Sequence, residues 1–219
     1  MLISHSHRFI FIHTAKTGGM SIRQVLAPLC EEPARFRTPR PRPEVDGRAN
    51  PLYVAWQSLL LHAPARAAAR ELPEAFDAYL TFAFVRNPWD WQVSMYHFIL
   101  REPTSRTHEE VKALGSFEAY LRWIVEARAP YPKGIPKRQS DMLTGDDGRL
   151  LVDVVGRYER LAEDFAALGA RLGIPGGLPR LNRSEHGAFR DYYTPTTRAL
   201  VARHLEEDID RFGYTFDGP

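Results

Sequence analysis

Six consecutive residues near the N-terminus, Lys16-Thr17-Gly18-Gly19-Met20-Ser21, have the composition of an anion-binding loop. The two glycines let the backbone turn sharply and approach a ligand closely. The helix expected to follow would offer unpaired N–H groups and the positive end of its dipole. Lys16 adds a full positive charge, and Thr17 and Ser21 add hydroxyl donors. These residue types predict a site for a phosphate or a sulfate-like group.

A second polar run, Arg86-Asn87-Pro88-Trp89-Asp90, follows the apolar segment 81–85. Arginine is a planar donor that suits a phosphate group. Ser94 lies about two helical turns after Arg86, so its hydroxyl is expected near the same anion. Both polar runs follow a predicted strand, and ligands bind such α/β sheets beyond the carboxyl ends of the strands. We therefore expect the two runs to meet and to bind a ligand with two separate anionic groups.

A kinase and a non-catalytic binding protein are the alternatives to this interpretation. A P-loop kinase would need the pattern G-x-x-x-x-G-K-[ST], whereas Lys16 here precedes the glycines. It would also need acidic metal ligands, for which Asp90 and Asp153 are candidates. The pattern G-x-G-x-x-G is also missing, and no metal-ligand constellation stands out. A non-catalytic protein that binds nucleotides or sulfated glycans could use four arginines of the segment 33–43: Arg35, Arg37, Arg40 and Arg42.

The elements that must position these residues alternate between strand and helix. Apolar runs at 8–13, 81–85 and 150–155 predict buried strands, the first followed by a helix capped by Ser21 and the second by a helix starting at Pro88. Periodic apolar residues or helix-forming composition predict further helices at 64–75, 117–128, 161–172 and 195–211. This alternation predicts an α/β fold: a single domain over 1–219, with a mostly parallel sheet flanked by helices.

Two segments are expected to lack regular structure. Residues 33–43 contain four prolines and four arginines, which predicts a long loop over 31–51 with the composition of a mobile segment. His5 and His7 lie on an N-terminus that is expected to fray.

Composition bounds the class of protein. The chain has 219 residues, 44% of them hydrophobic, and a formal net charge of +2, which is too balanced to indicate nucleic-acid binding. No apolar run is long enough for stable membrane insertion. A single cysteine, Cys30, excludes an intramolecular disulfide and makes the cytoplasm the expected location.

The two polar runs, in their context, resemble known motifs. Phe11 to Ser21 resembles the 5′-phosphosulfate loop of sulfotransferases that use 3′-phosphoadenosine 5′-phosphosulfate (PAPS), and Phe84 to Asp90 with Val93 to Tyr96 resembles their 3′-phosphate motif. Similar stretches at 156–165 and 181–214 extend the resemblance, which is to the Golgi-type carbohydrate and bacterial branch. The sequence departs from the residues that are usual in these motifs at Thr14-Ala15, Met20 and Trp91.

The resemblance implies a P-loop-NTPase-like sulfotransferase fold, with PAPS as cosubstrate, its 3′,5′-bisphosphate (PAP) as product, and no metal. It implies that Arg86 and Ser94 bind the 3′-phosphate and that Arg183 and Ser184 contact the nucleotide. The residues implied to hold the 5′-phosphosulfate are Lys16, Thr17, Gly18, Gly19 and Ser21, with Lys16 also catalytic. The expected acceptor is a hydroxyl of a carbohydrate or other small polar molecule.

A hydroxyl acceptor also requires a base. His62 is the preferred candidate, because it ends the run Leu59–Leu61 and because Leu61 to Pro64 resembles a family segment with a histidine near the acceptor. A structural His62 is the competing interpretation. The residues 139–141 resemble an acceptor-side stretch, and the alternative bases are carboxylates: Glu31, Glu32 and Asp141.

Overall fold

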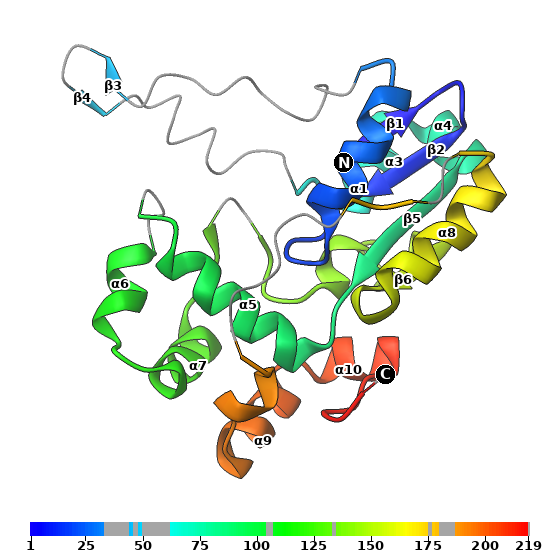
Figure 1. The fold of residues 1–219 in the computed structure, drawn as a ribbon. Coiled ribbons are helices and arrows are strands. Elements are labelled where there is room, and N and C mark those ends of the chain that lie inside the picture. The colour runs from blue at the N-terminus through cyan, green and yellow to red at the C-terminus, as the bar shows by residue number, and fades with distance from the viewer. Residues whose placement is uncertain are drawn as a thin grey trace.

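The structure is a computed structural model that describes residues 1–32, 44–45, 48–49, 62–103, 107–132, 135–174, 177–179 and 187–218. At its centre lies one four-stranded sheet in the order β1-β2-β5-β6 (Figure 1). The strands are β1 (Leu2–Ser4), β2 (Phe9–Ile12), β5 (Leu80–Val85) and β6 (Val154–Arg157). β2, β5 and β6 are parallel, whereas β1 is antiparallel to β2. The fold is therefore α/β with a mixed sheet.

Two expectations about the strands were wrong. The N-terminus is not frayed: Met1, Leu2 and Ile3 are buried, and β1 pairs with β2 through the register Leu2 to Phe11. Apolar side chains that can be buried at the sheet edge make this pairing favourable, which the histidines between the strands obscured. The third predicted strand, 150–155, is observed as β6 from Val154 to Arg157, and Asp153 just before it bonds Thr81 of β5.

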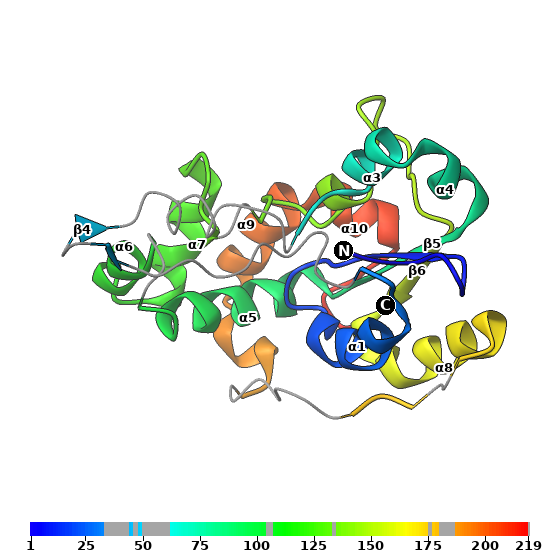
Figure 2. The same cartoon turned by 90° about the horizontal axis from the view of Figure 1, so that it is seen from above.

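Helices cover both faces of the sheet (Figure 2). On one face, Phe9 and Phe11 of β2 pack with apolar residues of α1 (Gly19–Leu26) and α8 (Leu161–Leu172). On the other, Ile10 and Ile12 pack with residues of α3 (Ala65–Glu71) and α10 (Glu206–Phe212). Alternate side chains of one strand thus serve opposite faces, which explains why its sequence is apolar throughout.

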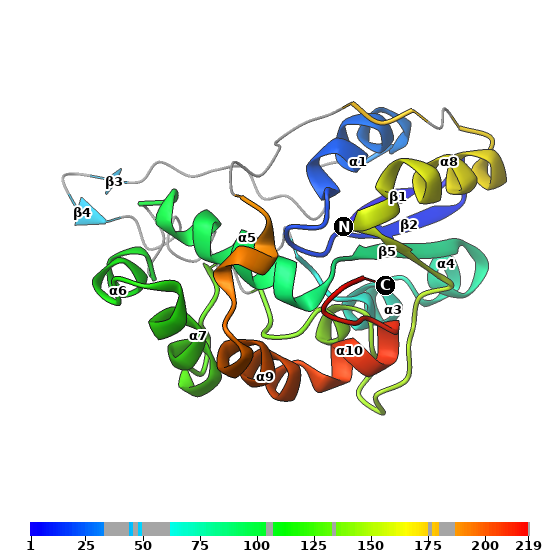
Figure 3. The same cartoon turned by 60° about the horizontal axis from the view of Figure 1, so that its bottom comes forward.

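A second layer of helices lies beside the sheet and holds the long helix α5 (Pro88–Leu100), as Figure 3 shows. Buried aromatic residues join α5 to its neighbours; for example, Trp89 meets Phe216 edge-on with ring centroids 5.6 Å apart. This packing fixes the start of α5, where the second polar run lies. The neighbouring helices are α6 (His108–Ala113), α7 (Phe117–Glu126) and α9 (Pro195–His204).

Two predicted helices are interrupted. The helix expected over 64–75 ends before Pro73, and α4 (Pro73–Ala78) starts there because proline suits the first turn of a helix. The helix expected over 195–211 divides at Leu205, whose side chain is buried in the same apolar cluster as Trp89 of α5.

Within the predicted loop 31–51, the strands β3 (Glu44–Val45) and β4 (Arg48–Ala49) form a short antiparallel pair, so the loop is not wholly irregular. Residues 33–43, with the four arginines considered for a glycan binder, lie outside the described residues. Among the helices that the structure describes, none is long and apolar enough to cross a bilayer.

Candidate active site

The first polar run connects β2 to α1 through a strained turn. Lys16 has a positive φ of 62°, and Gly18, with a φ of 79°, precedes α1 as its N-terminal cap residue. The left-handed conformation costs a residue other than glycine about 1–3 kcal/mol, so surrounding contacts must hold Lys16 in it. The expectation that Ser21 caps the helix was wrong, because Ser21 already lies in its first turn and donates its N–H to the Gly18 carbonyl at 3.0 Å.

The side chain of His13 packs against this turn at Gly19. A Cβ built on Gly19 would lie 2.0 Å from His13 Nε2, so the buried imidazole occupies the space that a side chain at position 19 would need. Burial lowers the pKa of His13 well below its usual value, and the charges of His62, the terminal amine and Arg23 add to the effect. The turn therefore rests on a neutral imidazole.

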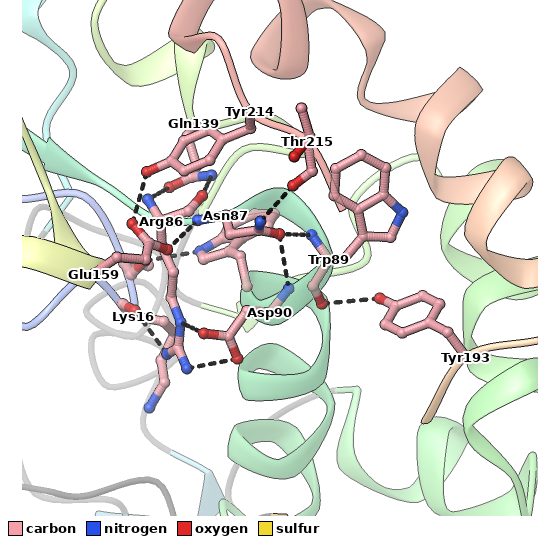
Figure 4. Close-up of polar contacts among 12 residues, drawn as sticks. Lys16, Arg86, Asn87, Trp89, Asp90, Gln139, Glu159, Tyr193, Tyr214 and Thr215 are labelled. Atoms are coloured by element: carbon pink, nitrogen blue, oxygen red, sulfur yellow. Dashed lines mark hydrogen bonds and ion pairs between the residues drawn. The ribbon is translucent and has the colours of Figure 1, made fainter. Parts of the chain in front are cut away.

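The second polar run is anchored by contacts from distant segments (Figure 4). The side chain of Asn87 accepts from the N–H of Trp89 at 3.1 Å, which caps α5, and its Nδ2 donates to the Thr215 carbonyl at 2.8 Å. The Asn87 N–H donates to Glu159 Oε1 at 2.7 Å, and Glu159 Oε2 accepts from the hydroxyl of Tyr214. Residues from three parts of the chain thus hold the start of α5.

Arg86 is buried and makes a two-pronged ion pair with Asp90, with Nε to Oδ2 at 2.8 Å and Nη2 to Oδ1 at 2.9 Å. Its guanidinium also lies over the ring of Tyr158, 4.2 Å from the centroid. The side-chain amide of Gln139 bonds both the N–H and the carbonyl of Arg86 at 2.8 Å. The arginine is therefore fixed in place, and Asp90 compensates its charge.

The two runs meet at the carboxyl edge of the sheet, as expected. Arg86 Nη1 donates to the Lys16 carbonyl at 3.2 Å. Lys16 in turn places its Nζ 4.9 Å from the ring centroid of Phe98 on α5. Asp90, Ser94 and Phe98 follow one another at four-residue spacing, so they line one face of α5, and that face meets Lys16 and Arg86.

Ser94 contributes an unsatisfied group to this face. Its side chain is buried, and its hydroxyl has no hydrogen-bond partner within the described part of the chain. Buried polar groups without a partner are uncommon in native proteins and call for an explanation, which a ligand would supply.

Side chains bond four consecutive carbonyl oxygens before the glycines. The His13 carbonyl accepts from His62 and that of Thr14 from Thr17 Oγ1, while the Ala15 carbonyl accepts from Trp91 Nε1 at 2.8 Å and the Lys16 carbonyl from Arg86. These bonds fix the peptide planes on the approach to α1. Its first N–H groups have no carbonyl one turn earlier within the helix. Together with the charge of Lys16, they suit an anion.

His62 lies against this loop. Its Nδ1 is 2.8 Å from the His13 carbonyl, which can only accept, so Nδ1 carries the hydrogen and Nε2 is the basic nitrogen of the neutral ring. His62 also lines a small pocket with Thr14, Trp91, Gln139 and Met142. The histidine is thus oriented by the same loop that contains Lys16.

The alternative carboxylates have other partners. Glu31 accepts from the N–H groups of His5 and Ser6 in the β1–β2 turn, at the opposite edge of the sheet, and hydrogen bonds from Ser6 and His5 lower its pKa to about 2. Asp141 is paired with Arg138 at 2.9 Å. The N–H groups of residues 139 and 140 bind buried Asp208, and the Gln139 side chain reaches both Arg86 and the pocket that His62 lines. The acceptor-side role of this stretch stays a prediction.

The metal ligands considered for a kinase are also far apart. Asp153 bonds Thr81 near the start of β5, whereas Asp90 bonds Arg86 just beyond its end. Five residues of extended strand span about 16 Å. The two carboxylates therefore cannot share an ion.

Arg183 and Ser184 lie outside the described residues, as does most of the segment before His62. The sequence predicts 139–141 only as an acceptor-side stretch. The bonds from Gln139 to Arg86 and from Asn87 to Glu159 do not follow from it. The Arg86–Asp90 pair had a local signal: a four-residue spacing at the start of a helix.

The chain is similar to known proteins. The family described as "Sulfotransferase family" matches residues 1–215. An uncharacterized protein of Archaeoglobus fulgidus is 31% identical over 118 residues, which cover 52% of this chain and 86% of that relative. No solved structure matches the chain significantly. Since the family match covers nearly the whole chain, this protein belongs to the sulfotransferase family.

Proposed function

We propose that the protein transfers the sulfuryl group of PAPS to a hydroxyl of a carbohydrate or another polar acceptor. One observation carries the proposal: the two polar runs that resemble anion-binding motifs of the family lie at one sheet edge, joined by the bond from Arg86 to the Lys16 carbonyl. Lys16 and the first turn of α1 would bind the 5′-phosphosulfate, together with Thr17, Gly18, Gly19 and Ser21. Arg86 and Ser94 would bind the 3′-phosphate, and the unsatisfied Ser94 hydroxyl fits this role.

Arg86 retains donors for that role despite its ion pair. A guanidinium has five N–H groups, and three of them bond Asp90 and the Lys16 carbonyl, which leaves two among the contacts of the described residues. The 5′-phosphosulfate would meet the ammonium group of Lys16 and the first N–H groups of α1.

The proposed reaction is an in-line displacement at sulfur. The acceptor oxygen forms a bond to sulfur while the bond from sulfur to the bridging phosphate oxygen breaks, and the electron pair of that bond stays on the phosphate of PAP. Lys16 stabilises the charge that develops there. The acceptor proton passes to Nε2 of His62, whose Nδ1–H is held by the His13 carbonyl.

Ligand-dependent thermal stability tests the donor. PAP should raise the melting temperature far more than AMP or ATP at equal concentration, because only PAP has a phosphate at both positions. Equal stabilisation by AMP would contradict the assignment of Arg86 and Ser94. A screen of carbohydrate acceptors with labelled PAPS then tests transfer, and tight PAP binding without transfer to any acceptor would identify a non-catalytic binder.

The base is tested separately. His62→Ala should lower turnover while PAP affinity remains nearly unchanged, because His62 bonds the His13 carbonyl, three residues before Lys16, and not a peptide unit of Lys16 itself. His204→Ala is the control, because His204 is also partly buried but lies at the end of α9. Loss of PAP binding by His62→Ala would instead identify His62 as structural.

A further inference from the structure

We infer that Trp91 is a positioning residue for Lys16, acting through the backbone of the anion-binding loop. Position 91 is one of those at which the residue differs from the one usual in the motif that the chain resembles. Its indole is almost completely buried on α5, and its Nε1–H donates to the Ala15 carbonyl at 2.8 Å. The inference rests on the proposed function, since it assigns Lys16 to the 5′-phosphosulfate.

The bond acts directly before the strained residue. Ala15 precedes Lys16, and the Ala15 carbonyl belongs to the peptide unit whose N–H is that of Lys16. Fixing this peptide plane limits rotation about the bonds that give Lys16 its φ of 62°. A left-handed residue persists only when its surroundings hold it there. Trp91 supplies one of those restraints, and Arg86, through the Lys16 carbonyl, supplies the next.

Trp91 is itself held firmly. Its ring meets that of Tyr131 edge-on, with centroids 5.2 Å apart, and Tyr131 donates to the buried side chain of Gln92 at 3.0 Å. The indole therefore transmits the position of α5 to the loop. The indole carries no charge, so its contribution to the loop is geometric.

Trp89 offers a matched control on the same helix. It is also buried, and its Nε1–H donates to the Arg198 carbonyl at 3.1 Å, on the side of α9. Trp91→Phe and Trp89→Phe each remove one indole N–H from a backbone carbonyl. Only the first removes it from the anion-binding loop.

The test measures loop opening and phosphate binding in the full-length protein. Amide hydrogen exchange of a peptide covering 13–21 should be faster in Trp91→Phe and unchanged in Trp89→Phe. Affinity for PAP should fall by about three- to tenfold in Trp91→Phe, the expected effect of one lost hydrogen bond. Affinity for 3′-AMP, which lacks the 5′-phosphate, should remain unchanged, a split that general destabilisation would not produce.

Each other outcome overturns the inference: unchanged exchange in Trp91→Phe, equal effects of the two variants, or an equal loss of PAP and 3′-AMP affinity. If the wild-type protein binds no PAP, the proposed function fails, and the exchange comparison still decides whether Trp91 holds the loop. If Trp91→Phe does not fold, replacement of Trp91 by 3-benzothienylalanine keeps the bicyclic ring, removes the N–H and serves the same comparison.

Discussion

The two polar loops at the sheet edge differ in what their donors are doing. In the loop after β2, side chains from elsewhere bond the carbonyls, and the charge of Lys16 lies over the ring of Phe98. In the loop after β5, most donors already serve the protein: the Asn87 amide donates to the Thr215 carbonyl, and Arg86 is paired with Asp90. The first loop is thus built to present donors, and the second to be rigid.

This difference shows that a motif identifies residue types, but not whether their donor groups already have partners within the protein. The guanidinium of Arg86, for example, already has a partly buried carboxylate partner in Asp90, 2.8 Å away. A ligand phosphate near Arg86 also meets Asp90, which reduces the net attraction. We therefore expect the first loop to dominate affinity and rate, and the second to dominate selectivity.

The largest effect is expected from Lys16→Ala. It removes the positive charge but keeps a Cβ, so the backbone cost of the left-handed conformation is unchanged. Turnover of labelled PAPS should fall by about 100- to 1000-fold, the usual consequence of losing one group that stabilises transition-state charge. Lys112→Ala, at an exposed position of α6, is the control. Activity within tenfold of wild type would remove Lys16 from the mechanism.

Gly19→Ala tests the support beneath the first loop. The added Cβ would meet His13 Nε2, and forcing extra volume into such a packed site costs about 1–3 kcal/mol of unfolding free energy. Denaturant unfolding measures it. Gly187→Ala is the control, since a Cβ there meets nothing within 4 Å. His13→Ala should restore part of the loss in the double variant, and failure to do so would argue that His13 is not the obstacle.

Acid should weaken the same support. The pKa of His13 is lowered well below 6.5 in the folded protein, so below pH 6.5 the unfolded state binds a proton that the folded state does not. Stability from this group is therefore complete above pH 6.5 and falls as the pH falls, by up to about 1.4 kcal/mol per pH unit. Denaturant unfolding between pH 5 and 7 should show a shallower slope for His13→Gln. An unchanged slope would assign the acid sensitivity elsewhere.

The smallest effect is expected from Ser94→Ala in the second loop region. Because the hydroxyl has no partner among the described residues, its removal should leave stability unchanged. PAP affinity should fall by about three- to tenfold while AMP affinity is unchanged. Ser140→Ala removes another buried hydroxyl, in a residue that bonds Asp208, and should change neither affinity. A loss of AMP binding in Ser94→Ala would place Ser94 outside the 3′-phosphate site.

Local sequence determined much of this arrangement. The glycines after β2, the proline at the start of α5 and the helix end at Gly173 act through the conformations of neighbouring residues, so they could be recognised without the rest of the chain. The strand-end rule then sufficed to bring Lys16 and Arg86 to one edge. The exact start of α1 was missed because two left-handed residues tighten the turn before it.

Tertiary structure alone decided how these residues are held. Three contacts show this: the His13 imidazole lies against Gly19, the Gln139 amide bonds Arg86, and the Trp91 indole bonds the Ala15 carbonyl. The last two join segments that are distant in the chain. Such contacts depend on how helices pack against the sheet, and packing leaves no short-range pattern in the sequence. The same reason explains β1, which became a strand because an open edge of β2 could bury it.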